Sequence, residues 1–336
     1  MRSSSIFYFL LGILYFLALC QLQLALADLT VSHHGHHVSI VNEPSIKAAA
    51  EVPSGGLVGG SRRFITAELS YLALTQNVPG DFVETGVFNG GTAAVMLKVL
   101  AEFDPNMERK FYACDSFEGL PAPVEEDNGA RELSVDGKPI VSTFTGAAGT
   151  FACDINCFTG NLKGVGVWDE NRIVLVKGWF NESLPKIAVK KISFLRLDGD
   201  LYVSTRDGLK YLYDKVSPGG YIYVDDYGSF AGCAQAVDEF RKARGITAKM
   251  HSVTEAWNEN NLQVPLDTTL HKFEAVWWQK PLEGEGGDSG EGAPAVPAGG
   301  GDDDAPASTS HHHHRHLGPK PTMSSHEQRH HHRTEV

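Results

Sequence analysis

The amino-acid sequence predicts an α/β fold, in which a mainly parallel sheet is covered by helices on both faces. Between about Arg63 and Lys280, short apolar runs alternate with stretches of helical periodicity, and this alternation is typical of α/β layer folds. Several of the runs are apolar at every position, as expected for strands that are buried on both sides. The length of this region fits one domain.

Six runs are strand candidates, and three helical stretches lie between them. The strands are expected at Asp81–Thr85, Lys110–Asp115, Ile173–Lys177, Ile192–Asp198, Tyr221–Asp225 and Glu274–Gln279. The helices are expected at Thr92–Phe103, Ser204–Val216 and Ala234–Arg244, the second opening on a capping box of Ser204 and Asp207. The stretch Pro121–Gly166 has no clear period, and loops of that length are usually functional, so we expect a lid over the active site.

The two ends of the chain of 336 residues differ from this domain in composition. Met1–Ala27 combines one basic residue, an apolar run and a small-residue cleavage site, which predicts a signal peptide or a signal anchor. Residues 28–62 are polar and contain several glycines, which predicts a flexible lead-in to a domain that spans residues 63–280. Residues 281–336 are acidic and rich in histidine with almost no large apolar residues, which predicts a disordered tail.

Charge and cysteine content narrow the class of protein. The formal net charge of −12 argues against a nucleic-acid partner, because no basic stripe is present to neutralise phosphates. The leader predicts the secretory pathway, in the lumen of the endoplasmic reticulum or Golgi or outside the cell, with membrane contact only if the leader remains as an anchor. In that setting Cys153 and Cys157 are the pair that could form a disulfide, whereas Cys114 and Cys233 are expected to be buried thiols.

The first chemical motif is a strand that runs into a glycine-rich turn and a helix, Glu84-Thr85-Gly86-Val87-Phe88-Asn89-Gly90-Gly91-Thr92. Its glycines let the backbone approach a ligand closely. The spacing matches neither the dinucleotide motif nor the P-loop. Glu84 directly before the turn disfavours a phosphate and favours a ligand with a cationic amino or sulfonium group. Alone the turn is weak evidence, since such turns are also common structural devices.

The second motif begins with Asp115, which ends the next strand and is followed by Ser116 and Phe117. An acidic residue at this distance after a glycine-rich turn commonly binds ribose hydroxyls. A helix cap is an equally good interpretation of Asp115 taken alone.

Acidic residues also end two later strands, Asp198 with Asp200 on one and Asp225 with Asp226 on the next. One strand–helix–strand unit separates the pairs, so both strands should be parallel and their carboxylates should meet at one sheet edge. Converging carboxylates repel unless a cation or a proton intervenes. An all-oxygen cluster favours Mg²⁺ or Mn²⁺. We therefore expect Asp198, Asp225 and Asp226 to bind a metal, although solvated loop acids are the alternative.

Five ordered motifs make the domain similar to a known family. They are Phe82-Val83-Glu84-Thr85-Gly86-Val87, Asp115-Ser116-Phe117-Glu118-Gly119-Leu120-Pro121, Lys177-Gly178-Trp179-Phe180, Arg196-Leu197-Asp198-Gly199-Asp200 and Ser217-Pro218-Gly219-Gly220-Tyr221-x-x-Val224-Asp225-Asp226-Tyr227. Between about Arg62 and Lys280 the chain resembles the macrocin O-methyltransferase (TylF-type) family of sugar methyltransferases.

The resemblance implies a class I S-adenosylmethionine methyltransferase, a Rossmann-like fold with a seven-stranded sheet. It implies that residues Glu84 to Gly91 cradle the methionine part of S-adenosyl-L-methionine, that Asp115 binds the ribose, and that Gly178, Trp179 and Phe180 bind the adenine edge. It also implies that Asp198, Asp225 and Asp226 carry Mg²⁺ and that Asp198 is a candidate base.

The predicted reaction is therefore O-methylation of a sugar or glycan hydroxyl, with Asp198 or Asp200 taking the proton. A catechol-type methyltransferase and an inactive cofactor-binding module are the alternatives. A nicotinamide oxidoreductase is disfavoured by the glycine spacing. The sequence is compatible with a monomer or a homo-oligomer.

Overall fold

The structure is a computed structural model, and it describes residues 30–33, 36–39, 44–51, 58–128, 132–135, 138–141, 147–257 and 270–282. Two small antiparallel hairpins stand apart from the main sheet, β1 (Thr30–His33) with β2 (His36–Ser39) and β5 (Glu132–Val135) with β6 (Lys138–Val141). The leader at 1–27 and the tail from 283 onward lie outside the described residues, so the predictions for them stay predictions.

The main sheet has seven strands in the order β10-β11-β9-β8-β3-β4-β7. Its strands are β3 (Asp81–Thr85), β4 (Phe111–Asp115), β7 (Ile173–Lys177), β8 (Ile192–Leu197), β9 (Val216–Val224), β10 (His251–Trp257) and β11 (Leu270–Gln279). The pairs from β7 to β9 are parallel, and β11 and β10 are added antiparallel at one side. The predicted mainly parallel α/β sheet is confirmed.

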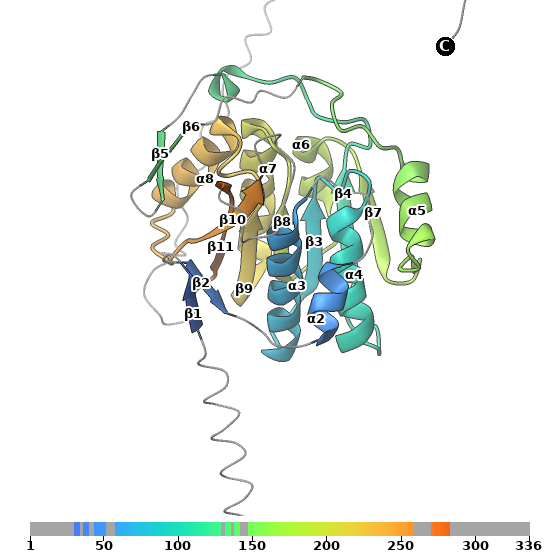
Figure 1. Cartoon of the computed structure of the whole chain (residues 1–336). Coiled ribbons are helices and arrows are strands. Elements are labelled where there is room, and N and C mark those ends of the chain that lie inside the picture. Colours follow the sequence, from blue (N-terminus) through green and yellow to red (C-terminus); the bar gives the residue numbers. More distant parts are fainter. Residues whose placement is uncertain are drawn as a thin grey trace, which may run out of the picture. The chain divides into compact units, whose positions relative to one another are not determined.

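Helices cover both faces of this sheet (Figure 1). The helices are α2 (Pro44–Ala50), α3 (Gly60–Thr75), α4 (Gly91–Phe103), α5 (Ile155–Gly164), α6 (Phe180–Ser183), α7 (Tyr202–Leu212) and α8 (Ala231–Ala243), with short 3-10 turns at Glu125–Asp127, Leu184–Lys186 and Tyr213–Lys215. Helices α3 and α4 pack in one apolar core with Phe82 and Phe194, and α7 and α8 pack in a second core with Val83 and Leu195. Alternate residues of β3 and β8 therefore face opposite helical layers.

Several boundaries differ from the sequence prediction because the deciding contacts come from far along the chain. Helix α7 begins at Tyr202 rather than Ser204, and its N-cap, Leu201, makes no side-chain cap bond. The Asp127 carboxylate instead accepts a hydrogen bond from the Tyr202 backbone N–H at 2.7 Å. The predicted capping box is therefore wrong. Strand β9 begins at Val216, before the Pro218-Gly219-Gly220 sequence that was expected to precede it.

The stretch from Pro121 to Gly166 contains a regular helix, which the absence of apolar periodicity had hidden. Helix α5 buries only Phe158 and Leu162, while the Asp154 carboxylate caps it by accepting from the Cys157 backbone N–H at 2.8 Å.

Within the described residues, no helix has the length and apolar character needed to span a bilayer.

Within residues 28–62, where a flexible lead-in was predicted, the described residues form the β1–β2 hairpin, helix α2 and the first turn of α3. Ala49 and Ala50 of α2 are buried in the core, and α3 begins at Gly60 with Arg62 already buried. The folded part of the chain thus extends upstream of residue 63, because apolar α2 and the first turn of α3 have partners on the domain.

Candidate active site

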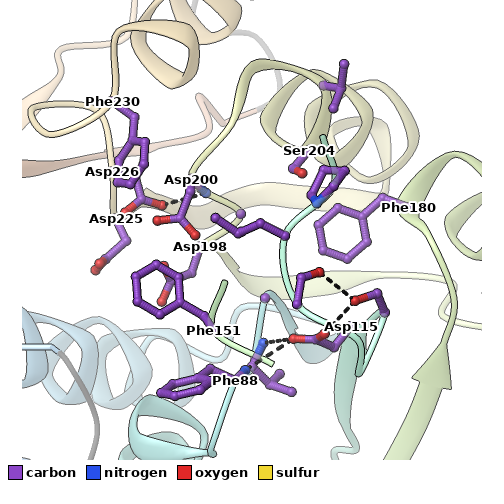
Figure 2. A pocket seen from close by; sticks show the side chains of 18 of the residues that line it. Phe88, Asp115, Phe151, Phe180, Asp198, Asp200, Ser204, Asp225, Asp226 and Phe230 are labelled. Carbon is purple, nitrogen blue, oxygen red and sulfur yellow. Dashed lines mark hydrogen bonds between the residues drawn. The ribbon is translucent and has the colours of Figure 1, made fainter. Parts of the chain in front are cut away.

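A pocket of about 710 Å³ lies where the parallel strands end, as ligand sites commonly do in open α/β sheets. Its wall includes the glycine-rich turn after β3, Asp115 after β4, Asp198 after β8 and Asp225 after β9. In Figure 2 the aspartates of β8 and β9 gather at one end, Asp115 lies at the other, and Phe151 lies between them. The pocket therefore joins the two sets of residues that the sequence singled out.

Asp115 fastens the glycine-rich turn to the neighbouring strand. One carboxylate oxygen accepts from the backbone N–H groups of Val87 at 2.8 Å and Phe88 at 3.2 Å. The other accepts from the N–H of Phe117 at 2.7 Å. Burial raises the pKa of Asp115, and these backbone donors oppose that rise. Asp115 thus shapes the turn as well as facing the pocket.

Most of the residues predicted to bind the cofactor line this pocket. They are Gly86, Asn89, Gly91, Thr92, Asp115, Ser116, Gly178, Trp179 and Phe180. The other three predicted residues, Thr85, Gly90 and Phe117, are not among the residues that line the pocket. Phe117 is buried and packs edge-to-face with Phe158 of α5.

Glu84 is buried and does not line the pocket either. This corrects the expectation that Glu84 contacts a ligand directly. The fully buried carboxylate accepts from the Thr92 hydroxyl at 2.5 Å and from the Arg196 guanidinium at 3.0 Å. Desolvation raises the pKa of Glu84 to about 7, while Arg196 and Thr92 act to lower it. Glu84 therefore stabilises the glycine-rich turn indirectly, through its hydrogen bond with Thr92 in the first turn of α4.

The predicted metal ligands come together. One oxygen from each of Asp198, Asp225 and Asp226 lies within 4.8 Å of the others. The backbone N–H of Asp225 still bonds to Leu197 O at 2.9 Å, whereas Asp226 follows in the turn. Strand β9 ends at Val224, so Asp225 and Asp226 both lie in the turn that follows it and their side chains need not point to alternating faces. Asp200 joins the cluster through its backbone N–H, which donates to the Asp226 carboxylate at 3.0 Å.

Two arginines complete the cluster, and neither is among the site residues predicted from the sequence. Arg196 is fully buried and contacts Glu84, Asp198 at 2.5 Å and Asp225. Arg62 of α3 reaches the other Asp225 oxygen at 2.6 Å. A charged residue inside the mostly apolar strand β8 was the signal for Arg196, because such a residue is buried only with partners. Arg62 had no local signal, since it lies 163 residues from Asp225.

Burial dominates the protonation of these acids. Desolvation raises the pKa of Asp198, and Arg196 opposes it. The pKa of Asp226 is raised well above its ordinary value by desolvation and then by the charges of Asp200 and Asp198. Asp200 is raised in the same way. A group of acids that resists ionisation is suited to bind a cation or to hold a proton.

Residues from the long stretch after Pro121 form one wall of the pocket. Phe151 lines the pocket and contacts the ring of Phe88 with centroids 5.8 Å apart. Cys153 and Cys157 form a disulfide directly after it, and Asn161 donates to Asn89 O at 3.1 Å. Cys114 and Cys233 are free and buried, as predicted.

The arrangement of sheet, glycine-rich turn and strand-end acids is that of a class I S-adenosylmethionine methyltransferase. The solved structure of the O-methyltransferase NovP matches it with a TM-score of 0.52 and 29% identity, covering 67% of this chain and 82% of that one. The model of the macrocin O-methyltransferase family matches residues 49–257. The chain belongs to this family, as the motifs predicted.

Two curated relatives show how far the similarity extends. Demethyldecarbamoylnovobiocin O-methyltransferase of Streptomyces niveus is 39% identical over 179 residues, which are 53% of this chain and 64% of that protein. Mycinamicin III 3''-O-methyltransferase of Micromonospora griseorubida is 31% identical over 175 residues, 52% of this chain and 65% of that protein. The chain thus spans slightly less than two thirds of the length of these relatives.

Proposed function

We propose that the protein is an S-adenosylmethionine-dependent O-methyltransferase that acts on a hydroxyl group of a sugar or glycan. The observation that carries the proposal is one pocket that connects the turn around Gly86 and Asp115 with the acid cluster of Asp198, Asp225 and Asp226. A methyl donor bound at the turn and an acceptor hydroxyl bound at the acid cluster would lie next to each other in this pocket. Positioning of that kind supplies much of the catalysis of a displacement reaction.

The cofactor half would bind through the backbone and Asp115. The pocket-facing turn offers backbone groups without a side chain at Gly86 and Gly91. Three backbone N–H groups donate to Asp115, and of about four acceptor positions on a carboxylate this leaves one for a ribose hydroxyl. Trp179, one of the exposed large apolar residues in the described part of the chain, and Phe180 offer aromatic surface for an adenine ring at the same end.

The acid cluster fits a hard divalent ion such as Mg²⁺ or Mn²⁺, because three carboxylate oxygens stand within 4.8 Å of one another. Asp198, Asp225 and Asp226 would hold the ion. When bound, it would lower the pKa of the acceptor hydroxyl and fix that oxygen near the cluster.

The protein's own share of the chemistry is to orient the acceptor and to receive its proton. In the transfer, a bond forms between the acceptor oxygen and the methyl carbon while the carbon–sulfur bond breaks, and the hydroxyl proton leaves to a carboxylate. Asp198 is our candidate for that carboxylate, because its side chain is 19% exposed and lines the pocket beside the other acids. Asp200 is the second candidate, since it also lines the pocket.

The test is incubation of the full chain with labelled S-adenosylmethionine, Mg²⁺ and a panel of free sugars, glycosides, glycans and small phenols. We expect label in one or more sugars. Label confined to phenols would favour a catechol-type enzyme. Cofactor binding without transfer to any acceptor would favour an inactive binding module.

We also propose that the protein enters the secretory pathway. The apolar leader at 1–27 motivates this, and the Cys153–Cys157 disulfide is consistent with it, because disulfides are rare in the cytosol. Cell fractionation and N-terminal sequencing test the proposal. A cytosolic protein that keeps Met1–Ala27 would contradict it.

A further inference from the structure

The carboxylate of Asp225 is the most heavily bonded of the proposed metal ligands. One of its oxygens contacts Arg196, and the other accepts from Arg62 at 2.6 Å. The side chains of Asp225 and Arg196 are at most 2% exposed, and that of Arg62 is 9% exposed. Both oxygens of this aspartate are therefore occupied by guanidinium groups inside the protein.

The two arginines differ in how they are held. Arg196 stands on the central strand β8, contacts Glu84 and Asp198 as well as Asp225, and lies over the ring of Tyr223 at 5.3 Å. Arg62 lies in the first turn of α3 and lines the pocket. Arg196 is thus fixed within the sheet, whereas Arg62 contacts Asp225 from the pocket side, where an ion would enter.

We infer that Arg62 is a resident counter-ion of Asp225 that competes with the metal, so that it lowers the metal affinity of the acid cluster. The inference rests on the metal site of the proposed function. Without an ion, Arg62 offsets the repulsion among Asp198, Asp225 and Asp226, whose oxygens crowd within 4.8 Å. With an ion, a guanidinium charge on the same carboxylate repels it, and in a buried site this repulsion is only weakly screened.

Arg62 accordingly affects the metal through its charge on Asp225 and does not itself bind the ion or the substrate. A role confined to holding Asp225 in place predicts the opposite sign, because loss of Arg62 would then loosen a ligand and weaken metal binding. The direction of the change in metal affinity separates the two roles.

The experiment measures Mg²⁺ and Mn²⁺ binding by calorimetry, and the metal-induced rise in Tm, for the full chain without S-adenosylmethionine. We expect Arg62→Met to bind the ion at least about tenfold more tightly than wild type, the effect of removing one nearby buried positive charge. Its Tm without metal should be lower, and its rise in Tm with metal should be larger. Arg62→Lys keeps the charge and should retain the wild-type affinity.

Arg63→Met is the matched control, because it makes the same change of charge one residue further along α3, at a side chain that does not line the pocket. It should leave the metal affinity unchanged. If Arg62→Met does not fold, Arg62→Gln supplies the same loss of charge with a hydrogen-bond donor for Asp225.

Unchanged or weaker metal binding in the uncharged Arg62 variants, with normal binding in wild type, overturns the inference and leaves the metal site standing. Equal tightening in Arg62→Lys overturns it as well, because the charge would then not be the cause. If neither wild type nor Arg62→Met binds either ion while both bind S-adenosylmethionine, the metal part of the proposed function fails, and the inference fails with it.

Discussion

Gly86 lies so close to Asp198 that a Cβ atom on Gly86 would stand 1.6 Å from the Asp198 carbonyl oxygen. The contact joins the end of β3 to the end of β8, where the Asp198 N–H also donates to Thr85 O at 2.9 Å. The glycine-rich turn that would bind the cofactor and the acid cluster are therefore in direct backbone contact at Gly86 and Asp198. A change at Gly86 must move one of them relative to the other.

Gly86→Ala should disturb both halves of the site. The backbone of Gly86 has φ of +80°, which costs a residue with a Cβ roughly 1–2 kcal/mol, and the contact with Asp198 adds to this. We expect lower stability in urea and loss of S-adenosylmethionine affinity by calorimetry. Gly166→Ala is the control, because Gly166 has φ of +76° but open space around its Cβ position. If both variants lose equal stability and keep cofactor affinity, the close contact has no role.

The strand-end residues of the site were predictable because they depend on chain order alone. Parallel strands that flank one helix must end at the same sheet edge, so Asp198, Asp225 and Asp226 could be placed together before any contact was known. Asp115 was predicted from its place at the end of the next strand and its distance after the glycine-rich turn. These predictions need the type and order of the elements but no side-chain packing.

The residues that the sequence did not reveal are held by contacts between distant segments. Arg62 was assigned to a flexible lead-in, since nothing near it in sequence indicates a buried partner. The start of α7 was misplaced because its first N–H is capped by Asp127, 75 residues earlier. Glu84 was predicted to line the pocket because it adjoins the glycine-rich turn. In the structure its carboxylate instead bonds to Arg196 inside the protein. Local patterns locate the turn, and packing decides which side chain faces the ligand.

Glu84 should make the metal-free protein less stable as the pH rises from about 4.5 to about 7. Its pKa is raised from 4.5 to about 7 in the folded protein, so between these values the folded chain holds a proton that the unfolded chain has lost. The free energy of unfolding then falls with increasing pH across that window. Asp198, Asp200 and Asp226, whose pKa values are also raised, add to the fall with the same sign.

Urea unfolding in chelator at several pH values measures this slope. Glu84→Gln should flatten it, because the amide has no proton to lose and can still accept from Arg196. Glu102→Gln, at an exposed glutamate of α4, should leave the slope as in wild type. A wild-type stability that rises through the same window would contradict the buried, partly protonated state of Glu84.

Asp226→Asn should lower turnover while leaving the affinity for S-adenosylmethionine nearly unchanged. Asp226 lies at the acceptor end of the pocket, and the amide oxygen can still accept from the Asp200 N–H, which now bonds at 3.0 Å. Loss of one negative ligand should cost on the order of 100-fold in kcat/KM, since a metal supplies several kcal/mol to such a reaction. The stability of the metal-free protein should rise slightly, because repulsion within the cluster is relieved.

Chelation provides the companion measurement. Turnover of wild type should vanish in excess chelator and return with Mg²⁺, whereas Asp226→Asn should need more Mg²⁺ for its residual activity. Full wild-type activity in chelator, or normal turnover of Asp226→Asn, would show that the acids act without a metal.

Reduction of the Cys153–Cys157 disulfide should weaken cofactor binding more than it weakens the fold. The bond closes a loop of sequence separation 4, so the chain-entropy contribution to stability is only about 2 kcal/mol. Yet Phe151, two residues before Cys153, forms part of the pocket wall, and Phe158 just after Cys157 packs against Phe117 behind the cofactor turn. Loosening this segment should therefore raise the Kd for S-adenosylmethionine in calorimetry with a phosphine reductant.

Cys157→Ser should show the same raised Kd without reductant and no further response to it, which separates the disulfide from the buried thiols of Cys114 and Cys233. Equal Kd values for oxidised and reduced wild type would mean that the wall keeps its shape through packing alone.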